Sequence, residues 1–175
     1  MNIAIVKYNA GNIYSVDYAL KRLGVEATIT ADKELLMKAD KVIFPGVGEA
    51  ETTMNYLREQ RMDTLIKDLK QPVLGIFDID VKKFQPLRHE DKVPHMGWNT
   101  LTDTRSELFK GFDKEEFVYF VHSFYVPLNE FTAATTDYIL PYSSALHKDN
   151  FYATQFHPEK SGAVGERILK NFIDL

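Results

Sequence analysis

The run QFHPEK at residues 155–160 places an imidazole and a carboxylate two positions apart, at His157 and Glu159. In an extended chain, residues two apart point to the same side, so these side chains can meet. A carboxylate beside an imidazole fixes its tautomer and stabilises its cationic form, as a general base requires. A surface histidine that happens to lie near a glutamate is the simpler interpretation, and spacing alone leaves both open.

A second candidate is the run PGVG at residues 45–48, which directly follows a short apolar stretch. Two glycines allow backbone N–H groups to turn outward and meet an anion or a developing oxyanion. An ordinary tight loop would have the same composition. The run is not a phosphate-binding loop, because the Gly-Lys-Ser/Thr ending of that motif is absent.

The remaining candidates surround the single tryptophan and the other histidines. Trp98 lies in the run PHMGWN at residues 94–99, where either a half-exposed interface position or a core position fits. His122 and Ser123 end a β-rich run, and either a pocket-facing or a structural role fits them. No two histidines have a helical or hairpin spacing that predicts a metal site.

The composition of the chain excludes several kinds of site and several classes of protein. The chain has 175 residues, a formal charge of −4 and no cysteine, which excludes disulfides, thiolate metal sites and a cysteine nucleophile within it. An isoelectric point near 5.7, with no run of basic residues, argues against nucleic-acid binding. No window is apolar enough to span a membrane, so we expect one cytoplasmic domain over residues 1–175.

The elements that must position these residues alternate in the first half. Apolar runs predict strands at 3–6, 25–29, 42–44 and 73–76. Helical spacing predicts helices at 13–23, stopped by Gly24, at 32–38, capped by Asp32, and at 54–69, broken near Arg61. Such alternation predicts a parallel sheet covered by helices, whose ligands bind beyond the C-terminal strand ends. The loops at 8–12 and 45–50 lie there.

The second half changes character. We predict an extended segment at 77–84, strands at 117–126 and 132–136, a hairpin over 146–155 turning at Asp149-Asn150, and a closing helix whose apolar stripe spans 164–173. The fold class is therefore α/β, a mostly parallel sheet flanked by helices, with an added antiparallel β layer.

Six motifs taken in order are more specific than any one of them: YNAGN (8–12), FPGVG (44–48), PVLGI (72–76), PHMGWN (94–99), YFVHS (119–123) and QFHPEKS (155–161). Over essentially the whole chain they resemble the class I, or triad, glutamine amidotransferases, which have a flavodoxin-like sheet. Within that family the chain looks like the glutaminase subunits of imidazole glycerol phosphate synthases.

The resemblance implies a mechanism and a set of roles. A cysteine attacks glutamine, and the released ammonia passes to a (β/α)₈ cyclase subunit in histidine biosynthesis, forming a heterodimer; no cofactor, metal, nucleic acid or membrane is implied. By the same resemblance His157 is the acid/base and Glu159 orients it, while Val47 and Gly48 serve the oxyanion. The glutamine backbone is held by Ser123 and Phe124, and the cyclase is faced by Asn12, Trp98, Tyr119 and Lys160.

The chain departs from the family where the nucleophile should be. The family carries Gly-x-Cys-x-Gly on a sharp strand-to-helix turn, whereas here Phe77 stands at the cysteine position and Ile79 at the second glycine. The following helix is missing too, on the order of 20 residues if that helix has a typical length of ~10–14. Three explanations stay open: the segment exists in the intact protein, was deleted from the gene, or was lost in a natural paralogue.

As written, the chain is predicted to lack glutaminase activity. The alternative function is that of a catalytically dead homologue that binds or regulates the barrel partner. A third interpretation, from another class, is an unrelated α/β hydrolase that pairs His157 and Glu159 with Ser123 or Ser143, although neither serine lies in Gly-x-Ser-x-Gly.

Overall fold

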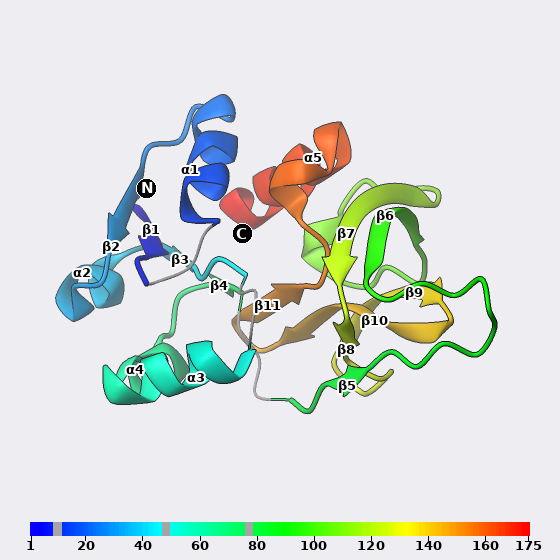
Figure 1. Cartoon of the computed structure of the whole chain (residues 1–175). Coiled ribbons are helices and arrows are strands. Elements are labelled where there is room, and N and C mark those ends of the chain that lie inside the picture. Colours follow the sequence, from blue (N-terminus) through cyan, green and yellow to red (C-terminus); the bar gives the residue numbers. More distant parts are fainter. Residues whose placement is uncertain (9–11, 47–49, 76–78) are drawn as a thin grey trace. The chain divides into compact units, whose positions relative to one another are not determined.

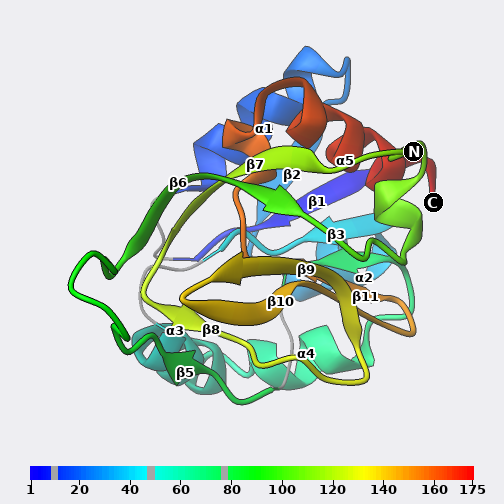
Figure 2. The same ribbon diagram turned by 90° about the vertical axis from the view of Figure 1, so that its right-hand side faces the viewer.

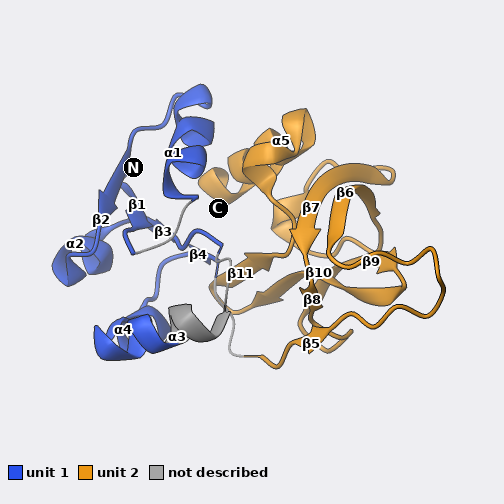
Figure 3. Cartoon of the chain, in the orientation of Figure 1, with its two compact units in different colours: residues 1–76 blue, residues 77–175 orange. Residues whose placement is uncertain are grey.

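The computed structural model describes residues 1–8, 12–46, 50–75 and 79–175, with the side chains of 50–54 outside the description. The chain forms two compact units, residues 1–76 and residues 77–175, shown in different colours in Figure 3. The division falls at the same junction where the sequence lacks the nucleophile segment. Each unit is described by itself below.

The first unit contains a parallel sheet of four short strands, β1 (Ile3–Val6), β2 (Ala27–Thr30), β3 (Lys41–Ile43) and β4 (Val73–Leu74). They lie in the order β2-β1-β3-β4 (Figure 1). All four residues of β1 are buried, as a strand with neighbours on both edges and helices on both faces requires. The predicted alternation of strands and helices is confirmed.

Four helices cover this sheet, α1 (Ile13–Arg22) on one face and α3 (Ala50–Glu59) with α4 (Met62–Asp68) on the other, as Figures 1 and 2 show. The short α2 (Lys33–Lys38) follows β2. Local signals set their ends as predicted. Asp32 caps α2 by accepting hydrogen bonds from two backbone N–H groups, Gly24 has φ +76° after α1, and Arg61 has φ +52° between α3 and α4.

The second unit is mainly antiparallel. β9 (Thr132–Tyr138), β10 (Leu140–Lys148) and β11 (Phe151–Thr154) lie side by side, and the β10–β11 hairpin turns at Asp149 as predicted (Figure 2). Two further pairs are β5 (Lys82–Lys83) with β8 (Phe124–Tyr125), and β6 (His95–Leu101) with β7 (Glu116–His122). Short 3₁₀ turns lie at Glu107–Phe109 (η1) and Pro158–Lys160 (η2), and α5 (Gly162–Asp174) packs against both turns and β7.

The fold class is confirmed: a mostly parallel sheet flanked by helices, with additional antiparallel strands from the second half. Three details differ from prediction. The run 94–99 forms most of β6, which lacks a clear apolar alternation. The predicted strand 117–126 divides into β7 and β8 around Ser123, and the extended segment 77–84 pairs only at 82–83, with 77 and 78 outside the described residues. Among the helices of the described residues, none is long and apolar enough to cross a membrane.

Pairing of β6 with β7 brings His95 and His122 opposite each other, which their separation in sequence did not predict. His95 is 3% exposed, and its ring stacks on Phe120 and Tyr138. The His122 Nδ1–H donates to the Phe124 carbonyl at 2.7 Å, so its Nε2 is an acceptor, and both His95 Nδ1 and the Tyr142 hydroxyl face it at 3.2 Å. The His122 ring is therefore neutral and fixed in one tautomer.

Burial lowers the pKa of His95 and of His122 to about 4 in each case, and a neighbouring histidine adds to the effect. The unfolded chain takes up these protons near pH 6.5, so between about pH 6.5 and 4 it binds more protons than the folded chain. The free energy of unfolding should therefore decrease as the pH falls through this window. Urea unfolding at pH 7.5 and at pH 5.0 measures the decrease.

His122→Gln should weaken this pH dependence, whereas His89→Gln, at an exposed position, should leave it unchanged. An unfolding midpoint of the wild-type chain that stays constant between pH 7.5 and 5.0 would contradict the neutral pair.

Candidate functional site

The second unit brings His157 and Glu159 together. The Nδ1 atom of His157 lies 2.9 Å from Oε1 of Glu159, and the Glu159 side chain is only 5% exposed against 23% for His157. The contact was predicted, but the reason given for it was wrong. The segment is not extended at Glu159: η2 begins at Pro158, and this turn brings the carboxylate back beneath the imidazole.

This geometry assigns the protons. The Nδ1–H donates to the buried carboxylate, which leaves Nε2 as the basic nitrogen on a ring that retains solvent access. A carboxylate held this close also stabilises the imidazolium formed when Nε2 takes up a proton. The arrangement is therefore that of an oriented general acid/base. Its backbone is anchored as well, because the His157 N–H donates to the Tyr119 carbonyl at 2.9 Å.

Ser123 and Phe124, which the resemblance assigns to the glutamine backbone, form the break between β7 and β8. Their carbonyl groups hold the local structure: that of Ser123 accepts from the Phe84 N–H at 3.0 Å, and that of Phe124 accepts from His122. The Phe124 ring is half exposed. Their direct contact with a substrate stays a prediction.

Trp98 and Tyr119 lie directly opposite each other on β6 and β7, with ring centroids 6.0 Å apart in an edge-to-face arrangement. Trp98 is 55% exposed, so of the two predicted environments the exposed one is correct. Met96 and Phe117 are also exposed, and the alternation of the strands puts them on the same face as Trp98. We call this exposed set, together with Tyr119, the aromatic face of β6–β7.

The two other residues assigned to the partner lie elsewhere in the described structure. Asn12 is the N-cap residue of α1 in the first unit, where its carbonyl accepts from Val16. Lys160 ends η2 in the second unit and is exposed, one residue beyond Glu159. Neither position tests the predicted role.

Val47, Gly48 and Phe77 lie outside the described residues, so the oxyanion loop and the nucleophile junction stay predictions. The described residues just before them are firmly held. The Tyr8 hydroxyl donates to the Pro45 carbonyl at 2.6 Å, and the Tyr8 ring stacks on Phe44 with centroids 4.7 Å apart. Burial raises the pKa of the Tyr8 hydroxyl, which keeps it a donor. A Cβ on Gly75, where φ is +150°, would overlap the Phe44 carbonyl.

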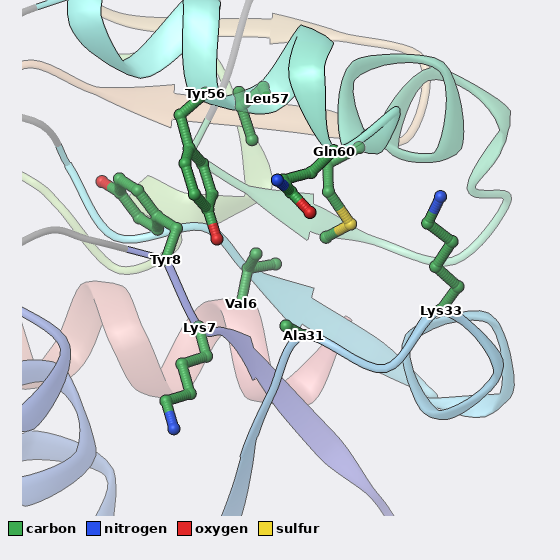
Figure 4. Close-up of a pocket in the computed structure, with 9 residues that line it drawn as sticks. Val6, Lys7, Tyr8, Ala31, Lys33, Tyr56, Leu57 and Gln60 are labelled. Atoms are coloured by element: carbon green, nitrogen blue, oxygen red, sulfur yellow. The ribbon is translucent and has the colours of Figure 1, made fainter.

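A cavity of about 70 Å³ opens beside Tyr8 in the first unit, at the carboxyl ends of β1 and β2 (Figure 4). Tyr56 and Gln60 of α3 and the loop after it project into it, and Lys7 points away. Ligands of parallel sheets bind at this edge, but the lining holds no acid/base pair. Its remaining members are Val6, Ala31, Lys33, Leu57 and Met62.

Sequence reasoning missed three residues that the structure places around these groups: Tyr8, His95 and Ser161. All three belong to the quoted family motifs, and this membership was the only sequence feature that could have indicated them. No spacing rule predicts the residues that they contact. The structure also weakens the serine hydrolase interpretation. Ser143 is buried, and its hydroxyl donates to the Pro127 carbonyl at 3.0 Å, so it is not presented to a substrate.

Among the described residues, no group of three or more histidine, aspartate or glutamate side chains is arranged to hold a metal ion. The His157–Glu159 pair has the geometry for proton transfer.

The chain is similar to known proteins over almost its whole length. The sequence model of the family "Glutamine amidotransferase class-I" matches residues 4–175. A protein of Bacteroides thetaiotaomicron named "Imidazole glycerol phosphate synthase subunit HisH" is 67% identical, with all of both chains covered. A protein of the same name from Buchnera aphidicola subsp. Schizaphis graminum is 37% identical, again with all of both chains covered.

Solved structures share the fold. A structure described as a GMP synthase protein from Thermoplasma acidophilum superposes with a TM-score of 0.78 at 23% identity, covering 99% of this chain and 92% of that one. A structure described as a glutamine amidotransferase gives a TM-score of 0.70 at 20% identity, covering 98% and 97%.

The Bacteroides thetaiotaomicron alignment extends over 196 positions although this chain has 175 residues, so 196 less 175, or 21, aligned positions have no residue here. This deficit agrees with the segment of about 20 residues expected to be missing. With the family match over residues 4–175 and full-length identity of 67%, the chain belongs to the class I glutamine amidotransferases, in the group of imidazole glycerol phosphate synthase HisH subunits.

Proposed function

We propose that this 175-residue chain retains the acid/base half of a glutaminase site and a surface for a (β/α)₈ cyclase subunit, but cannot itself hydrolyse glutamine. The observation that carries the proposal is the His157–Glu159 pair, with 2.9 Å between Nδ1 and Oε1, in a chain without any cysteine. Covalent hydrolysis of glutamine requires a thiol or hydroxyl nucleophile beside the oriented imidazole.

In a family member with its nucleophile, the thiolate attacks the side-chain carbon of glutamine and the carbon–nitrogen bond breaks. Nε2 of the group corresponding to His157 gives a proton to the leaving nitrogen, which departs as ammonia. The same nitrogen then takes a proton from the water that hydrolyses the thioester to glutamate. The imidazolium exists before the first transfer, when it carries the proton of the thiol, and after the second, until that proton returns to the sulfur; the carboxylate corresponding to the buried Glu159 stabilises it at both stages.

The other site residues follow the same proposal. Backbone N–H groups at Val47 and Gly48 stabilise the oxyanion, which the anchoring of Pro45 by Tyr8 supports. Ser123 and Phe124 hold the glutamine backbone at the break between β7 and β8. The cyclase is faced by Asn12, Trp98, Tyr119 and Lys160.

Residues 1–175 act in this proposal as one glutamine amidotransferase-like domain in the cytoplasm. The family match over residues 4–175 supports a single domain, although the nucleophile junction coincides with the boundary between the two compact units. The 21-position deficit supports loss of the nucleophile segment between Ile76 and Phe77.

A glutaminase assay tests the loss of activity. The chain, verified as 175 residues by intact mass, should release no ammonia above background with or without the cyclase subunit. A second chain should gain activity when it carries, at the 76–77 junction, the segment that the Bacteroides thetaiotaomicron protein has and this chain lacks. His157→Asn in that restored chain should abolish the activity again, since the leaving nitrogen then lacks its proton donor.

Turnover by the verified 175-residue chain would overturn the proposal of inactivity. An inactive restored chain would show that more than the nucleophile segment has been lost, which favours the alternative of a binding or regulatory homologue.

Binding to the cyclase subunit tests the proposed surface. The chain has one tryptophan, so titration with the barrel subunit should change the emission of Trp98 directly as the aromatic face becomes covered. Trp98→Ala should weaken binding by roughly 2 kcal/mol, or about 30-fold in Kd, as expected for an exposed aromatic anchor. Calorimetry measures this variant, which no longer fluoresces.

Leu128→Ala is the matched control, because Leu128 is similarly exposed but lies outside the aromatic face. Equal affinity of the wild-type chain and Trp98→Ala would remove Trp98 from the proposed surface.

A further inference from the structure

We infer that Ser161 is a positioning residue, whose hydroxyl fastens the turn carrying His157 and Glu159 to the backbone of Tyr119 on β7. The inference rests on the proposed acid/base role of His157 and Glu159 and deepens it. All of these residues lie within the second unit.

The Ser161 side chain has two hydrogen-bond partners and is almost fully buried, at 1% exposure. Its hydroxyl donates to the His157 carbonyl at 2.6 Å and accepts from the Tyr119 N–H at 3.0 Å. The Tyr119 carbonyl in turn accepts from the His157 N–H at 2.9 Å. Both backbone polar groups of Tyr119 and both of His157 are thus engaged in one closed ring of contacts.

A serine before a helix usually caps it, but this one does not. Ser161 precedes α5 as its N-cap residue, yet its side chain makes no capping hydrogen bond. The hydroxyl that would have capped α5 instead connects two segments about forty residues apart in sequence. An N-cap hydrogen bond normally stabilises a helix, so the bonds of Ser161 to His157 and Tyr119 take the place of a favourable contact.

The first turn of α5 supports the same geometry from the other side. Gly165 packs so closely that a Cβ there would overlap the Pro158 carbonyl and come within 2.9 Å of the Ser161 Cβ. The Ser161 N–H also donates to the Pro158 carbonyl at 3.1 Å. The turn η2 is therefore confined between α5 and β7. On the β7 side, the Ser161 hydroxyl contributes one of the hydrogen bonds that hold it.

Tyr119 gives this connection a functional meaning. Its backbone holds the His157 turn, while its side chain belongs to the aromatic face opposite Trp98. A partner that covers this face and moves Tyr119 therefore moves the His157 backbone as well, through the direct His157–Tyr119 hydrogen bond and through the two bonds of the Ser161 hydroxyl. Removal of the hydroxyl leaves the Tyr119 N–H and the His157 carbonyl without this partner.

The test compares Ser161→Ala with Ser143→Ala in the 175-residue chain. Ser143 is a matched control, because it is also buried in the second unit and its hydroxyl also donates to a backbone carbonyl, that of Pro127. The readout is the NMR resonance of the His157 Nδ1–H proton in its hydrogen bond to Glu159. Both variants should be destabilised to a similar extent in urea, but only Ser161→Ala should lose or broaden this resonance.

Addition of the barrel subunit extends the test. The His157 Nδ1–H resonance should shift on binding in the wild-type chain and in Ser143→Ala, whereas a resonance that is only broadened in Ser161→Ala should shift less, because only the direct His157–Tyr119 hydrogen bond then remains. A sharp resonance that shifts as far in Ser161→Ala as in the wild-type chain overturns the inference. Equal loss in both variants overturns it as well, because the effect would then be general destabilisation.

A measurement on the wild-type chain covers the case in which Ser161→Ala fails to fold. Hydrogen exchange of the Tyr119 amide should be as slow as that of the His157 amide, since each is held by the other segment. Fast exchange at Tyr119 overturns the inference. None of these readouts needs glutamine turnover, so a failure of the restored chain to hydrolyse glutamine counts against the proposed function separately.

Discussion

The alternation of side chains along β7 is the constraint on which the second unit depends. Successive residues of a strand point to opposite faces, so Val118 and Phe120 enter the core, with the half-buried His122 on the same face, while Tyr119 stays on the outer face with Trp98. The backbone between them remains available, and the His157 turn binds to it. One strand therefore fixes the histidine pair, the exposed aromatic face and the anchor of the acid/base pair together.

In the acid/base pair, the carboxylate is buried and the imidazole is partly exposed. Glu159 is buried, where a carboxylate requires a hydrogen-bonded partner, and His157 supplies it while its ring keeps solvent access. The histidines on β6 and β7 have the opposite character. They contact each other, and His122 also bonds to a backbone carbonyl. Burial lowers the pKa of both rings, so they stay neutral at a pH at which an acid/base catalyst gains and loses a proton. Of the three histidines His95, His122 and His157, only the last has the geometry for proton transfer, and the other two are structural.

The nucleophile is a different kind of loss from a point substitution. A cysteine replaced on an intact elbow would leave a recognisable turn, whereas the alignment leaves 21 positions without a residue. The acid/base pair survives because its contacts, to Tyr119 and Ser161, come from the second unit itself. In the first unit, the Tyr8 hydroxyl still holds the Pro45 carbonyl, just before the predicted oxyanion loop. Each unit therefore keeps its own local contacts beside the residues that the resemblance assigns to the site.

Local sequence signals predicted much of the fold because the forces behind them act over a few residues. Apolar runs identified β1, β3 and β4, and Asp32, Gly24 and Arg61 marked helix ends through capping and positive φ. The strand β6 was not predicted. Its exposed face carries the apolar residues Met96 and Trp98, so its sequence does not alternate between apolar and polar residues. The roles of Val47, Gly48 and Phe77 remain predictions.

The sequence by itself determined the family and the missing cysteine, and the resemblance predicted the pairing of His157 with Glu159, because each depends on residue types along the chain. Only the tertiary structure decided that His95 meets His122, that Trp98 is exposed and that Ser161 joins the His157 turn to Tyr119. The physical reason is the same in each case. These contacts join segments that are distant in sequence, and strand pairing and burial, which no local pattern encodes, set which atoms meet.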